Sequence, residues 1–334
     1  MRYRKLGVST IEASVLGVGA LHFGVFCDQK ATNDIVARAL DLGVNFIDVA
    51  PMYGSGSAEM MVKNAIKGRR DKVILATKVG LNPLFAADGT FGVEVMALNR
   101  KNIFSSMDKS LLALGTDHVD LFQVHAFDAS TPLEETWSAL TDLVRSGKTR
   151  WVGCSNYDHN EIARTVAVVK KNNTTDFVSL QCHYNLIERR AEQDIVPACV
   201  SNNYGIICYR ALCRGILSGR YKNDQPLPEG SRAQVSNRVR RWLTRDTLSL
   251  TQALEGFARD RSMTLPELSI AWLLERPAVA MVLAGMRNIE QLEVCVSGAN
   301  ARLTAQDMAD IDEVIASLSL RDQVNSLPEV FLEK

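Results

Sequence analysis

The sequence lacks a net charge, a long apolar run and a signal-like N-terminus. Its 334 residues carry 38 basic and 38 acidic side chains, so no general electrostatic attraction draws the chain to nucleic acid or to an anionic membrane. The longest stretches free of Asp, Glu, Lys and Arg, residues 13–27 and 195–209, are shorter than the roughly 18 apolar residues of a membrane-spanning helix. No apolar signal core follows the basic N-terminal residues. We therefore expect a cytoplasmic protein without a nucleic-acid or membrane partner.

Paired cysteine motifs are also missing. The chain has seven cysteines, and the closest two, Cys208 and Cys213, do not have the C-x-x-C spacing of a zinc or redox motif. Cys182 and His183 are adjacent, but adjacent residues on a strand point to opposite faces, so we do not expect them to share a metal ion. The sequence predicts buried, reduced thiols and no metal site.

Short apolar runs alternate with longer helical patterns along the whole chain. The runs are continuous rather than alternating, which is typical of parallel strands that are buried on both faces. The expected strands are 14–20, 45–50, 73–79, 118–126, 150–156, 177–184, 205–212 and 279–285. The expected helices are 31–42, 57–66, 99–114, 133–145, 161–171, 192–202, 248–260, 266–275, 289–297 and 305–317.

Eight βα units in a row predict a parallel sheet, and eight repeats over this length fit a closed barrel better than an open sheet. No linker rich in Pro, Gly or Ser divides the chain, so we expect a single domain over residues 1–334. Segments 3–6 and 11–14 predict a hairpin that could close the bottom of the barrel. The predicted fold is therefore α/β, a (β/α)8 TIM barrel with an N-terminal β-hairpin and an extra C-terminal helix over 305–317.

The glycine clusters do not complete a dinucleotide-binding fingerprint. The glycines of 17–19 are followed by His22 where the G-x-G-x-x-G pattern requires Gly, and those of 54–56 are followed by Glu59. An open Rossmann sheet is therefore not expected.

Four reactive side chains lie at or just after the ends of consecutive expected strands: Asp48, Tyr53, Lys78 and His125. Because parallel strand ends meet at one rim, we expect these side chains to form a proton-transfer set. A buried Lys78 needs a counter-charge, for which Asp48 is a candidate. An ammonium beside Tyr53 favours the phenolate and lowers the pKa of the phenol, and His125 could orient a carbonyl. Alternatively, Lys78 is the Schiff-base nucleophile of a barrel lyase.

The segments around these residues resemble the aldo-keto reductase family. The matching segments follow one another in family order along essentially the whole chain: 45–54 with Glu59, 153–157, Gln181 with 184–185, 215–220, and 285–288 with 291–292. The resemblance implies an oxidoreductase with the (β/α)8 fold. It also implies a nicotinamide cofactor, usually NADPH, and the reduction of an aldehyde or ketone to an alcohol.

The resemblance also implies a role for each matching residue. Tyr53 would donate the proton, Asp48 and Lys78 would tune the pKa of the Tyr53 hydroxyl, and His125 would orient the carbonyl. The implied cofactor contacts are Ala20, Asp48, Ser155, Asn156, Gln181, Tyr209, Arg210, Leu212, Gly215, Leu217, Gly219, Arg220, Gly285, Arg287 and Gln291. Those within 155–181 would bond the carboxamide, and Tyr209 would stack on the nicotinamide ring. Those within 212–220 would lie along the pyrophosphate, and those within 285–291 would hold the adenosine 2′-phosphate.

Two segments depart from the family pattern and leave NADH as the less expected alternative to NADPH. Residues 210–211 are Arg-Ala where the family often has Ser-Pro, and 294–295 are Val-Cys where Glu-Asn is common. A second function class also stays open, because some similar family members serve as cofactor-sensing subunits, such as potassium-channel β subunits. The partner that the enzyme hypothesis expects is a small carbonyl substrate.

Two expected connections are long, 80–98 and 213–247, and both follow strands at the end of the barrel where active sites form. They would shape the substrate pocket, with Met52, Phe85, Phe91 and Trp242 as candidate lining residues. The second connection contains five arginines with no acid between the first and the last: Arg232, Arg238, Arg240, Arg241 and Arg245. This segment is either a solvated face or a loop that folds over the cofactor or binds a phosphorylated substrate.

Overall fold

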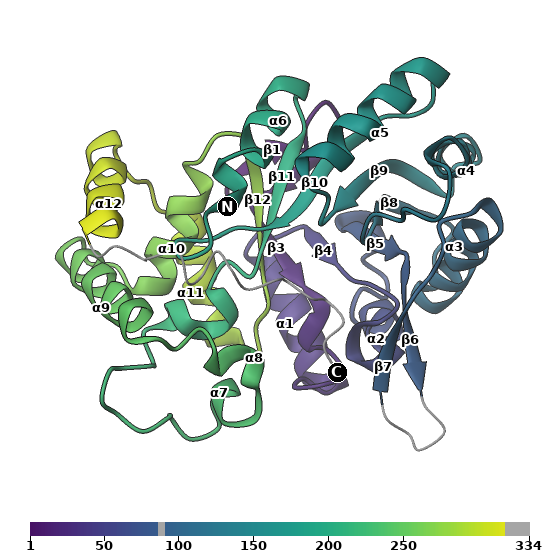
Figure 1. Cartoon of the computed structure of the whole chain (residues 1–334). Helices are drawn as coiled ribbons and strands as arrows, with labels where there is room; N and C mark the ends of the chain where they lie inside the picture. Colours follow the sequence, from purple (N-terminus) through teal and green to yellow (C-terminus); the bar gives the residue numbers. More distant parts are fainter. Residues whose placement is uncertain (86–90, 318–334) are drawn as a thin grey trace.

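The computed structural model describes residues 1–85 and 91–317. Eight parallel strands close into a barrel in the order β10-β11-β12-β3-β4-β5-β8-β9, with helices around it (Figure 1). The barrel strands are β3 (Leu16–Gly19), β4 (Phe46–Asp48), β5 (Ile74–Val79), β8 (Val119–Val124), β9 (Thr149–Ser155), β10 (Phe177–His183), β11 (Gly205–Tyr209) and β12 (Val279–Ala284). Each overlaps one expected strand, and the predicted (β/α)8 TIM barrel is confirmed.

The surrounding helices also follow the expected pattern. They are α1 (Gln29–Asp41), α2 (Ala58–Ala65), α3 (Arg100–Leu114), α4 (Leu133–Arg145), α5 (His159–Asn172), α6 (Ile195–Asn202), α9 (Arg245–Asp260), α10 (Leu265–Leu274), α11 (Ile289–Asn300) and α12 (Ala305–Ser317). The last is the expected extra C-terminal helix. Within the described ranges, none of the helices combines the length and the apolar character that crossing a bilayer requires.

Local sequence signals set the helix ends. Helix α5 begins with a capping box, in which Asp158 accepts a hydrogen bond from the backbone of Glu161 and the Glu161 side chain accepts one from the backbone of Asp158. Helix α3 ends at Gly115, whose φ of 62° lies in the left-handed region that favours glycine.

The bottom of the barrel is closed by the N-terminal hairpin, as predicted. Strands β1 (Tyr3–Lys5) and β2 (Glu12–Ser14) pair antiparallel, and β1 lies on the opposite side of the barrel from α7 and α8 in Figure 1. Leu6 and Ile11 pack into a buried cluster with Phe46, Leu121 and Met281 from the barrel strands. The apolar cluster therefore fills the barrel interior at this end.

Two connections differ from the simple loops that the sequence predicts. Residues 80–98 contain the antiparallel strands β6 (Leu81–Phe85) and β7 (Phe91–Val95). The strand β6 was missed because Pro83 lacks a backbone N–H and argues against a strand, whereas an edge strand of a two-stranded ribbon tolerates it. The connection after β11 contains the 3-10 helix η5 (Cys213–Ser218) and the short helices α7 (Arg232–Val235) and α8 (Asn237–Arg240). The elements η5, α7 and α8 therefore follow the carboxyl end of β11.

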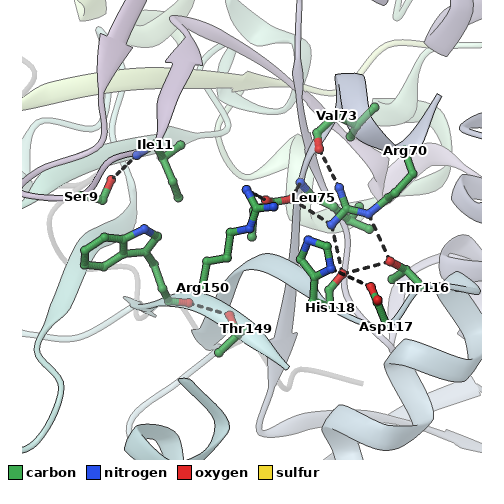
Figure 2. A network of polar contacts seen from close by, with 12 residues as sticks. Ser9, Ile11, Arg70, Val73, Leu75, Thr116, Asp117, His118, Thr149 and Arg150 are labelled. Carbon is green, nitrogen blue, oxygen red and sulfur yellow. Dashed lines mark hydrogen bonds and ion pairs between the residues drawn. The ribbon is translucent and has the colours of Figure 1, made fainter. Parts of the chain in front are cut away.

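A polar network ties the amino ends of β5, β8 and β9 together (Figure 2). The buried Asp120 accepts hydrogen bonds from the Leu75 backbone N–H and from Arg70, each 2.9 Å long. Arg150 reaches the other carboxylate oxygen at 3.2 Å. The Arg70 guanidinium also donates to the backbone carbonyl of Val73 at 2.7 Å. Asp120 therefore joins three strands at the end of the barrel that lies away from the strand carboxyl ends.

Replacing Asp120 tests this structural role. We expect Asp120→Asn to lower the free energy of unfolding by about 2 kcal/mol, because two charge-assisted hydrogen bonds are lost at a buried position. The measurement is urea unfolding at neutral pH. Asp34→Asn is the matched control, because the ion pair of Asp34 with Lys30 is exposed. Equal stability of the two variants would contradict a joining role for Asp120.

Candidate active site

Asp48, Tyr53, Lys78 and His125 meet at the carboxyl ends of the barrel strands. Asp48 ends β4, Lys78 lies on β5, and His125 follows β8 by one residue. Tyr53 begins the 3-10 helix η2 (Tyr53–Gly56). The Lys78 Nζ atom donates to Asp48 Oδ2 at 2.5 Å, to the carbonyl oxygen of Val49 at 3.1 Å and to the Tyr53 hydroxyl at 3.2 Å. The Tyr53 and His125 rings are edge-to-face, with centroids 6.1 Å apart.

The Asp48 carboxylate is fully bonded although it is only 2% exposed. While Oδ2 accepts from Lys78, Oδ1 accepts from the side-chain amides of Gln123 at 3.0 Å and Gln181 at 2.9 Å. A buried carboxylate is tolerated when it is paired and hydrogen-bonded in this way. Gln123 is a site residue that the sequence analysis missed; the available signal was an amide side chain on a strand whose residues are all buried.

Lys78 is a buried cation rather than a nucleophile. Its side chain is completely inaccessible to solvent. Burial alone would lower the pKa of Lys78, but the charges and hydrogen bonds of Asp48 and Tyr53 outweigh burial and raise the pKa above its ordinary value. A protonated amine has no lone pair with which to attack a carbonyl. The arrangement therefore argues against the Schiff-base lyase hypothesis.

The pKa of Tyr53 shifts in the opposite direction to the one the sequence analysis expects. Burial raises the pKa of the phenol, and the ammonium of Lys78, which lowers it, compensates only in part because Asp48 raises it further. The expectation of a lowered pKa is therefore wrong for the free protein. Its hydroxyl is protonated at neutral pH and has a proton to give.

His125 is held neutral beside this hydroxyl. Its side chain is buried, and its backbone N–H donates to the carbonyl of Val79 at 2.8 Å. Burial and then the charge of Lys78 hold the pKa of His125 well below its ordinary value. Its Nδ1 atom has no hydrogen-bond partner among residues 1–85 and 91–317. A neutral imidazole offers one donor and one acceptor, which suits the orientation of a polar oxygen.

The residues assigned by resemblance to the carboxamide lie directly beside this group. The Tyr209 hydroxyl donates to Asn156 Oδ1 at 2.7 Å, and Asn156 Nδ2 donates to the carbonyl of His125 at 2.8 Å. The Ser155 hydroxyl donates to the backbone carbonyl of Gln181 at 3.1 Å. Together these bonds link the ends of β8, β9, β10 and β11 into one polar surface next to Asp48.

The residues assigned to the pyrophosphate lie on the segment after β11. Helix η5 is kinked, with positive φ at Arg214 and Gly215, and a Cβ at Gly215 would meet no atom within 4 Å. Leu217 and Ala20, which follows β3, are completely buried in the free protein. The other residues assigned to the pyrophosphate, Leu212, Gly219 and Arg220, lie on the same connection, as does the further cofactor candidate Arg210.

The residues assigned to the 2′-phosphate form a positively charged corner. The Arg287 guanidinium lies over the Phe26 ring, 3.9 Å from its centroid, and Gln291 accepts a hydrogen bond from the Arg287 backbone N–H at 2.9 Å. Arg232 of α7 lies within the electrostatic reach of Arg287: burial and then the charges of Arg287 and Arg210 lower the pKa of the Arg232 guanidinium. In the described part of the chain, neither Arg232 nor Arg287 forms an ion pair with an acid.

The arginine-rich connection therefore has at least two different roles. Arg232 faces the charged corner, whereas Arg240 donates to the backbone carbonyls of Ala233, at 2.6 Å, and Gln234, and so holds α7 against α8. The side chain of Arg238 lies outside the described side chains, as do those of Phe85 and Phe91. Trp242 is buried edge-on against His183, with ring centroids 6.0 Å apart, rather than open to a pocket.

Comparison with known proteins places the whole barrel in one family. A family model described as the Aldo/keto reductase family matches residues 15–316. The chain is 31% identical over 326 residues to the Aldo-keto reductase YhdN of Bacillus subtilis (strain 168), a match that covers 94% of each chain. It is 32% identical over 330 residues to the L-glyceraldehyde 3-phosphate reductase of Escherichia coli (strain K12), covering 95% of this chain and 93% of the relative. It is also 32% identical over 321 residues to the Schizosaccharomyces pombe (strain 972 / ATCC 24843) aldo-keto reductase yakc, whose name carries NADP(+), covering 93% and 90%.

Proposed function

Because the chain belongs to the aldo/keto reductase family, it is an oxidoreductase that acts on carbonyl or alcohol groups with a nicotinamide cofactor, and we propose that it is an NADPH-dependent carbonyl reductase in which Tyr53 donates the proton. One observation carries this proposal. A protonated phenol lies 3.2 Å from a buried ammonium, at the rim where a substrate enters.

The four side chains have complementary tasks in this reaction. A nicotinamide cofactor, when bound, would supply the hydride for the carbonyl carbon. Tyr53 gives its proton to the carbonyl oxygen, and the neutral His125 ring holds that oxygen by a hydrogen bond. The Tyr53 phenolate left behind is stabilised by the Lys78 ammonium, which Asp48 fixes in place. The carbonyl thus gains two electrons and two hydrogens and becomes an alcohol.

The residues present fit a phosphorylated dinucleotide. Ser155, Asn156 and Tyr209 present a polar surface beside Tyr53 and His125 for an amide group. Arg232 and Arg287 supply positive charge without an acidic partner in the described part of the chain. A guanidinium binds a phosphate dianion well, so this corner favours NADPH over NADH.

A variant of the proton donor tests the catalytic assignment. We expect Tyr53→Phe to lower the reductive turnover number by about 10²–10⁴-fold, which is the usual contribution of a positioned general acid. The NADPH dissociation constant should stay near that of the unmodified protein, because the phenyl ring keeps the packing. The measurement is NADPH oxidation with a panel of aldehydes, keto sugars and enones, together with fluorescence titration of NADPH.

Tyr3→Phe is the matched control, since Tyr3 is an exposed tyrosine whose hydroxyl bonds the carbonyl of Gly43 far from the rim. Unchanged turnover in Tyr53→Phe would contradict the assignment. NADPH binding without turnover on any substrate in the unmodified protein would favour the cofactor-sensing subunit instead.

A charge-removing variant tests the cofactor preference. We expect Arg287→Gln to raise the Michaelis constant for NADPH by about tenfold or more, since losing a charge-assisted contact costs about 1.5–3 kcal/mol. The Michaelis constant for NADH should change little, because NADH has no 2′-phosphate. Arg302→Gln is the control, as Arg302 is exposed and pairs with Glu275. An equal effect on both cofactors would place Arg287 elsewhere than at the 2′-phosphate.

A further inference from the structure

His22 lies at the charged corner although no family motif assigns it a role. It ends the 3-10 helix η1 (Ala20–His22), which follows β3 at the carboxyl end of the barrel. Its ring is edge-on to the Phe26 ring, with centroids 5.4 Å apart, and Phe26 carries the Arg287 guanidinium on its face. A Cβ at Gly285 would lie 3.3 Å from His22 Cε1, so the missing side chain at Gly285 gives the ring its space.

One ring nitrogen of His22 is buried without a partner. Its Nδ1 atom is inaccessible to solvent and has no hydrogen bond within the described residues, while the ring makes a hydrogen bond to the backbone of Met286. A neutral ring has one donor and one acceptor nitrogen, and Nδ1 meets no partner for either role among the described residues. In the protonated ring both nitrogens are donors, so Nδ1 then requires an acceptor such as a phosphate oxygen.

The surroundings of His22 keep its ring neutral in the free protein. Burial, then the charge of Arg232 from α7, then that of Arg287 after β12, lower the pKa of His22 to about 4. The nearby Cys27 thiol has a raised pKa because of burial, so it is neutral too and does not compensate for the two guanidinium charges. Two cations and one unprotonated ring thus share the corner.

We propose that His22 is a further cofactor-binding residue, which takes up a proton when a phosphate group of the dinucleotide binds beside Arg232 and Arg287. The proposal rests on the proposed function. A phosphate dianion neutralises the two guanidinium charges that oppose protonation of the ring, and it offers an oxygen to the new Nδ1–H donor. One proton moves from solvent to the imidazole, and no covalent bond of the cofactor changes.

The sign of the pH effect follows from linkage. Because binding raises the pKa of His22 from about 4, the bound state holds more protons than the free state. Affinity for the dinucleotide then rises as the pH falls. The rise is up to about tenfold per pH unit between the pKa of His22 in the bound state and its pKa in the free state. The 2′-phosphate itself titrates near pH 6, and its protonation weakens the arginine contacts, which acts in the opposite direction. The variant His22→Gln keeps the effect of phosphate protonation and removes the effect of His22 protonation.

Calorimetry of NADP+ binding tests the proposal. Binding enthalpies are measured in two buffers of different ionisation enthalpy, and their difference gives the number of protons exchanged on binding. The pH is about 6, where both His22 and the 2′-phosphate can contribute. We expect His22→Gln to take up fewer protons than the unmodified protein, by as much as one. The ratio of its dissociation constant to that of the unmodified protein should increase as the pH falls. His159→Gln, on helix α5, is the control for the substitution itself.

A second measurement uses the unmodified protein and so does not depend on how the variant folds. The NMR signal of His22 should titrate at about 4 without ligand and at a higher pH with NADP+ bound. If His22 takes up a proton with NADP+ but not with NAD+, it contacts the 2′-phosphate. If it takes up a proton with both cofactors, it contacts the pyrophosphate. Equal proton exchange in His22→Gln and in the unmodified protein would overturn the proposal and leave the proposed function intact. Absence of NADP+ binding would refute the proposed function as well.

Discussion

The buried ion pair between Lys78 and Asp48 is the interaction on which the site depends. Neither charge is exposed to water, so each is stable only because the other is present and because amide and carbonyl groups satisfy the remaining bonds. Those bonds come from the ends of β4, β5, β8 and β10, so the barrel brings together the groups that satisfy the pair. Folding and the electrostatics of the site are therefore set by the same contacts.

Much of the fold and of the site could be predicted from the sequence, because both depend on residue order along strands. The apolar runs predict eight buried strands, and Asp48, Lys78 and His125 lie at strand ends that parallel topology must bring together. The strand β6 escaped prediction because it contains Pro83, a residue that is atypical of strand interiors. The direction of the Tyr53 pKa shift escaped prediction because burial and the Lys78 charge oppose each other, and the larger of the two effects depends on how the folded chain surrounds the phenol.

Net charge gave no indication of the charged corner. The whole chain is neutral, yet Arg232 and Arg287 gather where the described residues provide no acid to pair with them. Arg240, only eight residues after Arg232, instead donates hydrogen bonds to backbone carbonyls of α7, in the same connection after β11. The run of arginines in the sequence does not distinguish these roles, because the distinction lies in which carbonyls and which cations each guanidinium meets after folding.

Titration of the Tyr53 phenol in the free protein tests the central claim most directly. The phenolate absorbance of the unmodified protein minus that of Tyr53→Phe isolates this one residue, and Lys78→Met removes the neighbouring ammonium. We predict that Tyr53 ionises above the ordinary phenol value of about 10, and at a still higher pH in Lys78→Met, where the phenolate loses its stabilising cation. Ionisation of Tyr53 below that ordinary value, or an unchanged titration in Lys78→Met, would contradict the account.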